Sequence, residues 1–378
     1  MTSRHPRAYP MYGFGIQITT KWPCSHANLF YLKPLTMNRL VSIFVLFLLS
    51  CSAIVQAQDR PIALVIHGGA GTILRENMTA EMEAEYRAKL QEALQVGYAV
   101  LDEGGTSLDA VVATIKVLEE SPLFNAGRGA VYTAAAAHEL DASIMNGANR
   151  EAGAVAGVTN LRHPIEAARA VMEHSPHVMM AGPGAEQFAA EQNLELVNND
   201  FFDTEFRKGQ LEAVQERERM LDPKNGEGML SPAEVDYKFG TVGCVALDRE
   251  GNLAAGTSTG GMTNKRYGRV GDSPVIGAGT FAENATCGVS ATGHGEFFIR
   301  WTVASDIAAL MRYQDLSVAD AANKVVNEVL VEAGGSGGVI AMDREGNVAM
   351  PHNTPGMYRG YMKEGGEPQV FIYGDETE

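Results

Sequence analysis

Cysteine is scarce in this chain of 378 residues, which contains only four. Cys24 and Cys51 lie in an N-terminal segment with the features of a leader, so the body of the protein keeps only Cys244 and Cys287. Two cysteines cannot form the disulfide framework that holds small secreted domains together. We interpret both as small buried hydrophobic residues, with a single disulfide bridge as the alternative.

Motifs for metal and nucleotide binding are also missing. No His-Glu-x-x-His sequence and no paired Cys-x-x-Cys occurs, so a metal site built from them is not expected. His174 and His177 flank Pro176 and are expected at the surface. The glycine-rich HGGAGTIL (67–74) lacks a third glycine and no helix follows it directly, which argues against dinucleotide binding. GGMTNK (260–265) lacks the second glycine of a phosphate loop.

Acidic residues are absent from residues 1–57, which contain five basic ones. The remainder of the chain carries 25 basic and 46 acidic residues, a formal net charge of −21. So acidic a body argues against nucleic acid or an anionic membrane as a partner, because both would repel it. Hydrophobic residues at 45% and charged residues at 20% are typical of a protein with a large core.

The basic segment predicts an export signal. Met37 opens a stretch with a basic start, the apolar run LVSIFVLFLLS and a small-residue end at Val55-Gln56-Ala57, so we expect cleavage after Ala57. Residues 1–36 resemble neither leader nor domain, and we interpret them as an upstream extension that is not native. A membrane anchor is the weaker alternative, because the run is shorter than the roughly 20 residues of a spanning helix. The protein is thus expected to be periplasmic, or anchored as a lipoprotein through Cys51 in LLSC.

The body mixes strand and helix patterns. The run PIALVIHGGAG (61–71) predicts a strand buried on both faces, and the spacing of apolar residues predicts helices over 79–103 and 107–120. Strands are expected within 130–160, followed by helices at 164–174 and around 301–313. The near copies VALDREGNLA (245–254) and IAMDREGNVA (340–349) predict two hairpins. We therefore expect an α+β fold with two sheets between two helical layers, in a single domain.

The most polar part of the body is residues 198–240. Pro223, Gly226, Gly228 and Pro232 lie within it and are expected to break any long element. We interpret this stretch as an exposed connector of the kind where chains are cut. It divides the body into residues 58–240 and 241–378.

The connector ends at Gly240-Thr241 and passes directly into an apolar strand. A chain that cleaved itself there would place hydroxyl and α-amine on one residue, and an α-amine has an ordinary pKa of about 7.7–8.0, suitable for a general base. Arg269 and Asp272, three residues apart between glycines, could bind the carboxylate and ammonium of an amino acid. The alternative from the residues alone is an Arg-Asp salt bridge that braces a turn.

Several ordered motifs across residues 61–362 resemble the plant-type isoaspartyl peptidase and L-asparaginase family. They are IHGGAG, PLFNAGRGAV, HELDASIM, EAGAVAGV, GTVGCVALD, TSTGGMTNKRYGRVGDSP, TGHGEFFIR and NTPGMYRG. The resemblance implies an N-terminal nucleophile hydrolase with a four-layer αββα sandwich. It also implies autocatalytic activation, hydrolysis of the β-amide of isoaspartyl dipeptides and L-asparagine with release of L-aspartate, and a homodimer of cleaved α/β protomers.

The same resemblance assigns roles to residues. Cleavage between Gly240 and Thr241 would make Thr241 the nucleophile, beside the hydroxyl of Thr259. Arg269 would bind the substrate α-carboxylate and Asp272 the α-ammonium. The remaining assignments are an oxyanion hole at Thr292 and Gly293, a further substrate contact at Gly295, a positioning role for Asn125, and backbone carbonyls for a structural sodium ion at Leu118, Glu119, Ser121, Phe124, Ala126 and Arg128. No catalytic cofactor is implied.

Two alternatives remain open. The glycosylasparaginase branch resembles this chain at GRVGDSP but typically reads Thr-Asn-Gly where this chain has Thr259-Gly260-Gly261, which favours a small β-aspartyl substrate. An exported amino-acid-binding protein that never matures would keep Arg269 and Asp272, but retention of Thr241 with the other threonines argues against it. His294 and Arg128 depart from the family at positions that vary within it.

Overall fold

The computed structural model describes residues 60–221 and 240–376. The predicted leader, its upstream extension and Cys51 lie outside the described residues, as do residues 222–239. Within the described part of the chain, no helix is long and apolar enough to cross a membrane.

The first strand and the two helices after it match the sequence patterns. Strand β1 (Ala63–Gly71) is buried along almost its whole length. Helix α2 (Ala80–Asp102) begins after Thr79, whose side chain accepts a hydrogen bond from the Met82 N–H. Helix α3 (Ser107–Glu119) begins with a reciprocal capping box between Thr106 and Asp109. Local signals therefore determine these boundaries, and the predicted helices are confirmed.

The larger of two sheets has eight strands in the order β12-β11-β1-β5-β6-β2-β3-β4. Neighbours are antiparallel except β3 and β4, which are parallel. The other strands of this sheet are β2 (Leu140–Asn146), β3 (Ala152–Val158), β4 (Met179–Ala181), β5 (Val242–Leu247), β6 (Leu253–Thr259), β11 (Gly356–Lys363) and β12 (Gln369–Tyr373). Strand β5, which follows the Gly240-Thr241 junction, thus lies in the middle of the sheet.

The smaller sheet has four antiparallel strands in the order β10-β9-β8-β7. They are β7 (Thr280–Ala282), β8 (Cys287–Gly293), β9 (Gly337–Asp343) and β10 (Val348–Ala349). Strands β7, β8 and β9 pack against β1, β2, β5 and β6 of the larger sheet. The two sheets therefore face each other across a buried layer.

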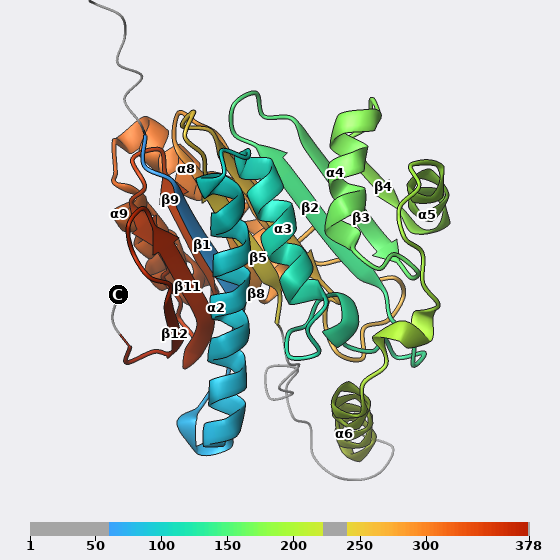
Figure 1. Ribbon diagram of the computed structural model, residues 1–378. Helices are drawn as coiled ribbons and strands as arrows, with labels where there is room; N and C mark the ends of the chain where they lie inside the picture. Colours follow the sequence, from blue (N-terminus) through green and yellow to red (C-terminus); the bar gives the residue numbers. More distant parts are fainter. Residues whose placement is uncertain (1–59, 222–239, 377–378) are drawn as a thin grey trace, which may run out of the picture. The chain divides into compact units, whose positions relative to one another are not determined.

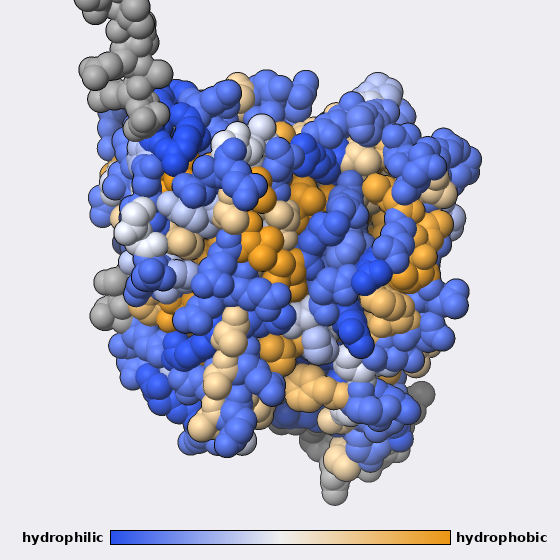
Figure 2. All heavy atoms as spheres, viewed as in Figure 1, coloured by the Kyte–Doolittle hydropathy of each residue, from blue (hydrophilic) through white to orange (hydrophobic). Residues whose placement is uncertain are grey.

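Helices cover the outer faces of both sheets. Figure 1 shows α2, α3 and α4 (Pro164–His174) against the larger sheet, and α8 (Val303–Gln314) and α9 (Val318–Asn323) contact the smaller one. In Figure 2 hydrophilic residues cover most of this face, with hydrophobic residues showing between the helices. The remaining segments are α5 (Gly182–Glu191), α7 (Gly295–Arg300), α10 (Leu330–Ala333), the 3-10 turns η1 (Arg75–Asn77), η2 (Gly127–Gly129) and η3 (Asn199–Phe202), and the π-helical η6 (Lys324–Val329).

Two apolar cores explain the continuous apolar run of β1. Leu64 and Ile66 belong to the core beneath α2 and α3, whereas Ala63 and Val65 belong to the core between the sheets. Alternate side chains of a strand point to opposite faces, so a strand covered on both sides has no polar face. The α+β prediction is confirmed.

Both predicted hairpins are present, and they share one turn chemistry. Strands β5 and β6 are joined at Gly251, with φ of +76°, and β9 and β10 at Gly346, with φ of +79°. Asp248 Oδ1 accepts from two backbone N–H groups at 3.1 and 2.8 Å, and Asp343 Oδ1 does the same at 3.0 and 2.9 Å. The repeated Asp-Arg-Glu-Gly-Asn is therefore a repeated turn.

The prediction that residues 198–240 contain no long element is wrong for the first half of this segment. Helix α6 (Glu205–Leu221) occupies 17 residues of it. Every breaker that motivated the prediction lies after residue 221, so the helix forms in the part that is free of proline. Arg207 on this helix is buried, and its Nε donates to the Gly129 carbonyl at 2.8 Å. The helix is thus anchored to the loop that carries Asn125.

Candidate active site

Thr241 lies one residue before the start of β5. Because Val242 is paired with Ser258 across β5 and β6, Thr241 lies opposite Thr259, the last residue of β6. The Thr241 hydroxyl donates a hydrogen bond of 3.1 Å to Thr259 Oγ1, and Thr241 is only 7% exposed. The two threonines that the sequence analysis associates with each other are therefore in direct contact.

Thr259 also reaches the peptide bond that precedes Thr241. Its hydroxyl donates to the Gly240 carbonyl at 3.4 Å and accepts from the Gly261 N–H at 3.0 Å. Because it accepts from Thr241 as well, its one proton is directed at the Gly240 oxygen. This arrangement would polarise the Gly240 carbonyl beside a second hydroxyl that could attack it.

The surroundings of Gly240 leave little space for side chains. A Cβ on Gly69, whose φ is +115°, would lie 2.9 Å from Gly240 Cα, and a Cβ on Gly240 would lie 3.3 Å from Asn125 Cβ. Asn125 is buried; its Oδ1 accepts from the Val131 N–H at 2.9 Å and its Nδ2 donates to the Gly261 carbonyl at 2.7 Å. Asn125 therefore holds together the two loops that flank Gly240.

The two residues predicted as an oxyanion hole lie at the end of β8. Thr292 is fully buried, and its Oγ1 accepts from the Ala70 N–H at 3.3 Å. This bond uses an acceptor position, so the Thr292 O–H remains a donor. Gly293 has φ of +151°, and a Cβ there would lie 2.4 Å from the Ser336 carbonyl oxygen. A side chain at Gly293 is excluded by both backbone conformation and space.

Arg269 forms its ion pair with Glu296 on α7. Its Nε and one Nη donate to the two carboxylate oxygens, each at 2.9 Å. The alternative of an Arg269-Asp272 salt bridge therefore names the wrong partner. Sequence analysis did not single out Glu296, although its position directly after Gly295 in TGHGEFFIR was a signal that could have drawn attention to it.

Asp272 is buried beside Arg269, and its Oδ2 has no hydrogen-bond partner among the described residues. Burial raises the pKa of Asp272 from 3.8 to about 7, while the nearby charge of Arg269 opposes the shift. A Cβ on Gly295 would lie 2.8 Å from Asp272 Oδ1 and 2.9 Å from an Arg269 Nη atom. The glycine thus leaves a carboxylate and a guanidinium facing one small space, which fits an amino-acid zwitterion.

Backbone carbonyls converge in the loop proposed for sodium. A Cβ on Gly129 would lie 2.0 Å from the Phe124 oxygen and 2.9 Å from those of Pro122 and Ser121. The carbonyls of Leu118 and Ala126, two others of the predicted set, accept hydrogen bonds from backbone N–H groups. Three carbonyl oxygens thus lie close to Gly129, and two of them, those of Phe124 and Ser121, belong to the predicted set.

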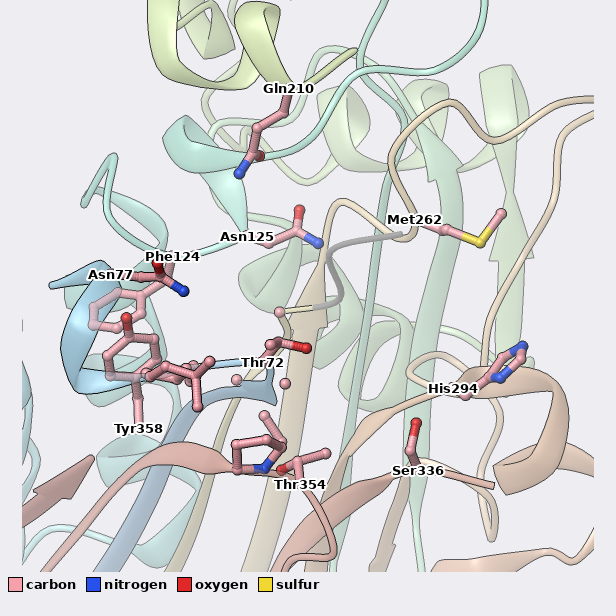
Figure 3. Close-up of a pocket in the computed structure, with 18 of the residues that line it drawn as sticks. Thr72, Asn77, Phe124, Asn125, Gln210, Met262, His294, Ser336, Thr354 and Tyr358 are labelled. Carbon is pink, nitrogen blue, oxygen red and sulfur yellow. The ribbon is translucent and has the colours of Figure 1, made fainter. Parts of the chain in front are cut away.

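A cavity of about 1120 Å³ opens over the Gly240 side of this site. Figure 3 shows Asn125, Met262, His294 and Ser336 around it, with Thr72 near its centre and Tyr358 among the residues at one side. Phe206 and Gln210 bring α6 to its wall. Gly240 and Glu296 line this cavity, but Thr241, Arg269 and Asp272 do not, so the cavity lies next to the proposed nucleophile and charged pair without including them.

Other candidate groups are inert in this fold. Cys244 and Cys287 are free and buried, as predicted. Their burial raises the pKa of both thiols, which disfavours the thiolate. His174 and His177 are exposed. In residues 60–221 and 240–376, no group of three or more His, Cys, Asp or Glu side chains could hold a metal ion.

His67 is a second residue that sequence analysis did not single out. It is fully buried on β1, and its Nδ1 lies 2.8 Å from the Thr241 carbonyl oxygen. A polar residue inside an otherwise apolar strand was the available signal, but its partner lies 174 residues away in the sequence. Only the sheet order brings β1 next to β5.

Comparison with known proteins gives a consistent result. A family model described as asparaginase matches residues 60–372. The chain is 53% identical to an isoaspartyl peptidase of Salmonella typhimurium over 310 residues, covering 82% of this chain and 98% of the relative. It is 52% identical to an isoaspartyl peptidase of Escherichia coli over 310 residues, 82% of this chain and 95% of that protein. A plant-type L-asparaginase of Pyrococcus abyssi is 40% identical over 317 residues, 82% of this chain and all of the relative.

Proposed function

The chain belongs to the asparaginase family, and on this premise we propose that it is a threonine hydrolase that cleaves the β-amide of β-aspartyl dipeptides and of L-asparagine. The names of the relatives, isoaspartyl peptidase and plant-type L-asparaginase, support this substrate class. The observation that carries the proposal is the Gly240-Thr241 junction. There the Thr241 hydroxyl lies 3.1 Å from Thr259, whose own hydroxyl is 3.4 Å from the Gly240 carbonyl.

Activation is proposed to be a cleavage of the chain by itself. Thr241 Oγ1 attacks the Gly240 carbonyl carbon, the peptide C–N bond breaks, and the amine takes up a proton, which leaves an ester between Gly240 and the Thr241 oxygen. The hydrogen bond from Thr259 to the Gly240 oxygen supports this step, because it stabilises charge that develops on that oxygen. Water then hydrolyses the ester and gives a Gly240 carboxylate and a free Thr241 α-amine.

The mature enzyme is proposed to use the same hydroxyl on its substrate. The α-amine of Thr241 takes the hydroxyl proton as the oxygen attacks the β-carbonyl, and the proton passes to the leaving amine or ammonia. Thr292 O–H and Gly293 N–H would stabilise the oxyanion. Water then releases L-aspartate from the β-aspartyl ester and restores Thr241.

Substrate orientation follows from the charged pair. Arg269 would bind the α-carboxylate and Asp272 the α-ammonium, so the side-chain amide is the group that faces Thr241. The unpartnered Oδ2 of buried Asp272 supports this role, because an ammonium would satisfy it. Ordinary α-linked aspartyl peptides should then fail as substrates.

Three further proposals concern the whole protein. The packing of helices on the outer faces of two facing sheets supports the αββα sandwich of N-terminal nucleophile hydrolases. The converging carbonyls near Gly129 support a structural sodium ion, which would brace the loop that carries Asn125. The short apolar run that ends at Ala57 supports export, with lipidation at Cys51 as the other route.

The test is a comparison of the wild-type chain with Thr241→Ala. Wild type should separate on a denaturing gel into two chains, the smaller of which begins at Thr241 by mass spectrometry. It should hydrolyse asparagine and a β-aspartyl dipeptide, but not the α-aspartyl isomer. Thr241→Ala should stay one chain and be inactive. A small chain that begins elsewhere, or an intact wild type that only binds amino acids, would overturn the proposal.

A further inference from the structure

A row of buried polar side chains crosses the layer between the two sheets. Sheet register places His67 opposite Gly243, Gly243 opposite Thr257, and Thr257 opposite Ser143, on the adjacent strands β1, β5, β6 and β2. The facing sheet contributes Ser290 on β8, paired with Thr280 on β7. All five side chains are fully buried beside the apolar core of that layer: His67, Thr257, Ser143, Ser290 and Thr280.

Continuous hydrogen bonds connect this row. His67 Nε2 lies 2.9 Å from Ser290 Oγ, which lies 2.7 Å from Thr257 Oγ1. Thr257 is 2.5 Å from Thr280 Oγ1, and Thr280 is 2.8 Å from Ser143 Oγ. Buried polar groups are costly unless they are bonded, and a fully bonded chain of this kind specifies one arrangement of the strands around it.

The Thr241 carbonyl defines the state of the imidazole. A carbonyl oxygen can only accept, so the His67 Nδ1 that lies 2.8 Å from it carries the proton. Burial lowers the pKa of His67 to about 3, so the ring is neutral near pH 7 and Nε2 has no proton. Ser290 therefore donates to Nε2, and the hydroxyl row determines both tautomer and ring orientation.

Gly243 provides the space for this contact. A Cβ there would lie 2.0 Å from Ser290 Oγ and 2.3 Å from His67 Nε2. The glycine two residues after Thr241 is thus required by the bond between His67 and Ser290.

Thr241 needs such support only once the chain is cut. The paired residues of β5 end at Gly243 on the β1 side and at Val242 on the β6 side, so Thr241 lies beyond both ladders. Chain ends fray unless they are tied down. Cleavage removes the covalent bond to Gly240 and leaves the Thr241 carbonyl as the backbone group through which the new terminus can be held.

We propose that His67 is a positioning residue for the nucleophile: its Nδ1–H holds the Thr241 carbonyl, and the hydroxyl row holds the ring, so that Thr241 keeps its place after cleavage. This inference rests on the proposed function, because it needs Thr241 to act as a free terminus. With Nε2 as acceptor, each of the four hydroxyls gives its one proton to the next group, from Ser143 through Thr280 and Thr257 to Ser290 and then the ring.

The experiment compares His67→Asn with His67→Gln in the full chain. The amide nitrogen of asparagine can replace Nδ1 as donor to Thr241, whereas that of glutamine replaces Nε2 and loses this donor. We expect kcat per matured chain to be about tenfold to a hundredfold lower for His67→Gln than for His67→Asn, because small misplacements of a reacting group have effects of this size. KM for a β-aspartyl dipeptide should differ little between the two. Equal kcat values would overturn the proposal.

Thr257→Val and Thr257→Ser provide the second comparison, at a residue that touches neither Thr241 nor the substrate. Valine has the shape of threonine without the hydroxyl, so kcat should fall about tenfold, whereas serine should stay within about threefold of wild type. A purely structural role would lower the thermal midpoint and the matured fraction but leave kcat per matured chain unchanged, which would contradict the proposal.

If the His67 variants do not fold, the two Thr257 variants decide. Inactive, uncleaved wild type would refute the proposed function, whereas active wild type with indistinguishable variants would refute the positioning role alone.

Discussion

Arg269 illustrates how much a single side chain depends on its planar shape. Both of its hydrogen bonds to Glu296 use a fork of two N–H groups. A lysine keeps the charge but offers one ammonium on a flexible stem. The two bonds hold the guanidinium in one orientation. In the proposed function, a substrate carboxylate would therefore bind to a group that is already in place.

We expect Arg269→Lys to lower kcat/KM by about a hundredfold or more on both asparagine and a β-aspartyl dipeptide, through loss of bidentate binding. Steady-state kinetics on matured enzyme provide the measurement. The control is Tyr313→Phe, at an exposed position on α8. It should leave kcat/KM unaltered on both substrates. A loss on only one substrate would contradict a shared α-carboxylate site.

Asp272 is expected to reduce stability for the sake of function. Its pKa in the folded chain is about 7, above the ordinary 3.8, so the folded state binds this proton more tightly than the unfolded state. The contribution of this bound proton to the free energy of unfolding is fully present below about pH 4. It declines as pH rises towards 7 and is absent above that.

Asp272→Asn should therefore raise the free energy of unfolding near pH 8, by up to about 4 kcal/mol, with a smaller gain at lower pH. Urea titrations at several pH values would measure this, with Thr241→Ala present in both proteins so that neither is cleaved. The same change in otherwise wild-type protein should abolish turnover. A gain that grows on acidification would show that the sign is wrong.

Two glycines inside helices differ in how much space surrounds them. On α2, a Cβ on Gly97 would lie 1.9 Å from Thr114 Oγ1 and 2.8 Å from Leu64 Cδ2, because α2 packs closely on α3 and β1. On α6, a Cβ on Gly209 would meet nothing within 4 Å. The first glycine is required by packing, and the second has no such constraint.

Gly97→Ala should destabilise the chain by about 1–3 kcal/mol through overpacking, whereas Gly209→Ala should stabilise α6 by about 0.5–1 kcal/mol. Each variant serves as the control for the other, because alanine favours a helix in both. Denaturant unfolding of the uncleaved Thr241→Ala protein gives the comparison. Stabilisation by Gly97→Ala would mean that α2 and α3 can move apart at little cost.

The sheet order has a consequence for the whole molecule if the proposed cleavage at Gly240-Thr241 takes place. Residues 58–240 contribute β1 to β4 of the larger sheet, and residues 241–378 contribute β5, β6, β11 and β12. Strand β1 lies between β11 and β5, and β6 lies between β5 and β2. The two products therefore share one sheet and both apolar cores.

We expect the cleaved chains to co-purify and to separate only in denaturant, because separation would expose strand edges and the buried layer between the sheets. Size exclusion under native conditions, followed by a denaturing gel of the peak, is the measurement. Uncleaved Thr241→Ala protein should elute at the same volume. Loss of either chain from the native peak would contradict the interleaved arrangement.

Local order is the part of this protein that its sequence determines alone. The caps at Thr79 and Thr106, the Asp-Arg-Glu-Gly-Asn turns and the apolar run of β1 act within a few residues, so the matching elements could be predicted. The connector was predicted less well, since breakers located after residue 221 do not prevent a helix before them. The resemblance to the family, carried by ordered motifs, pointed to Thr241, Thr259, Arg269 and Asp272, whereas the residues alone left a structural salt bridge open.

Tertiary structure alone decided which distant groups meet. The partner of Arg269 is Glu296 on α7, and the partner of the Thr241 carbonyl is His67 on a strand 174 residues earlier. The hydroxyl row needs four strands in one register and two more in the facing sheet. Periodicity shows which face of a strand is buried, but not which strand lies beside it. That choice depends on how the apolar faces of all the elements are covered together, and no single stretch of sequence contains it.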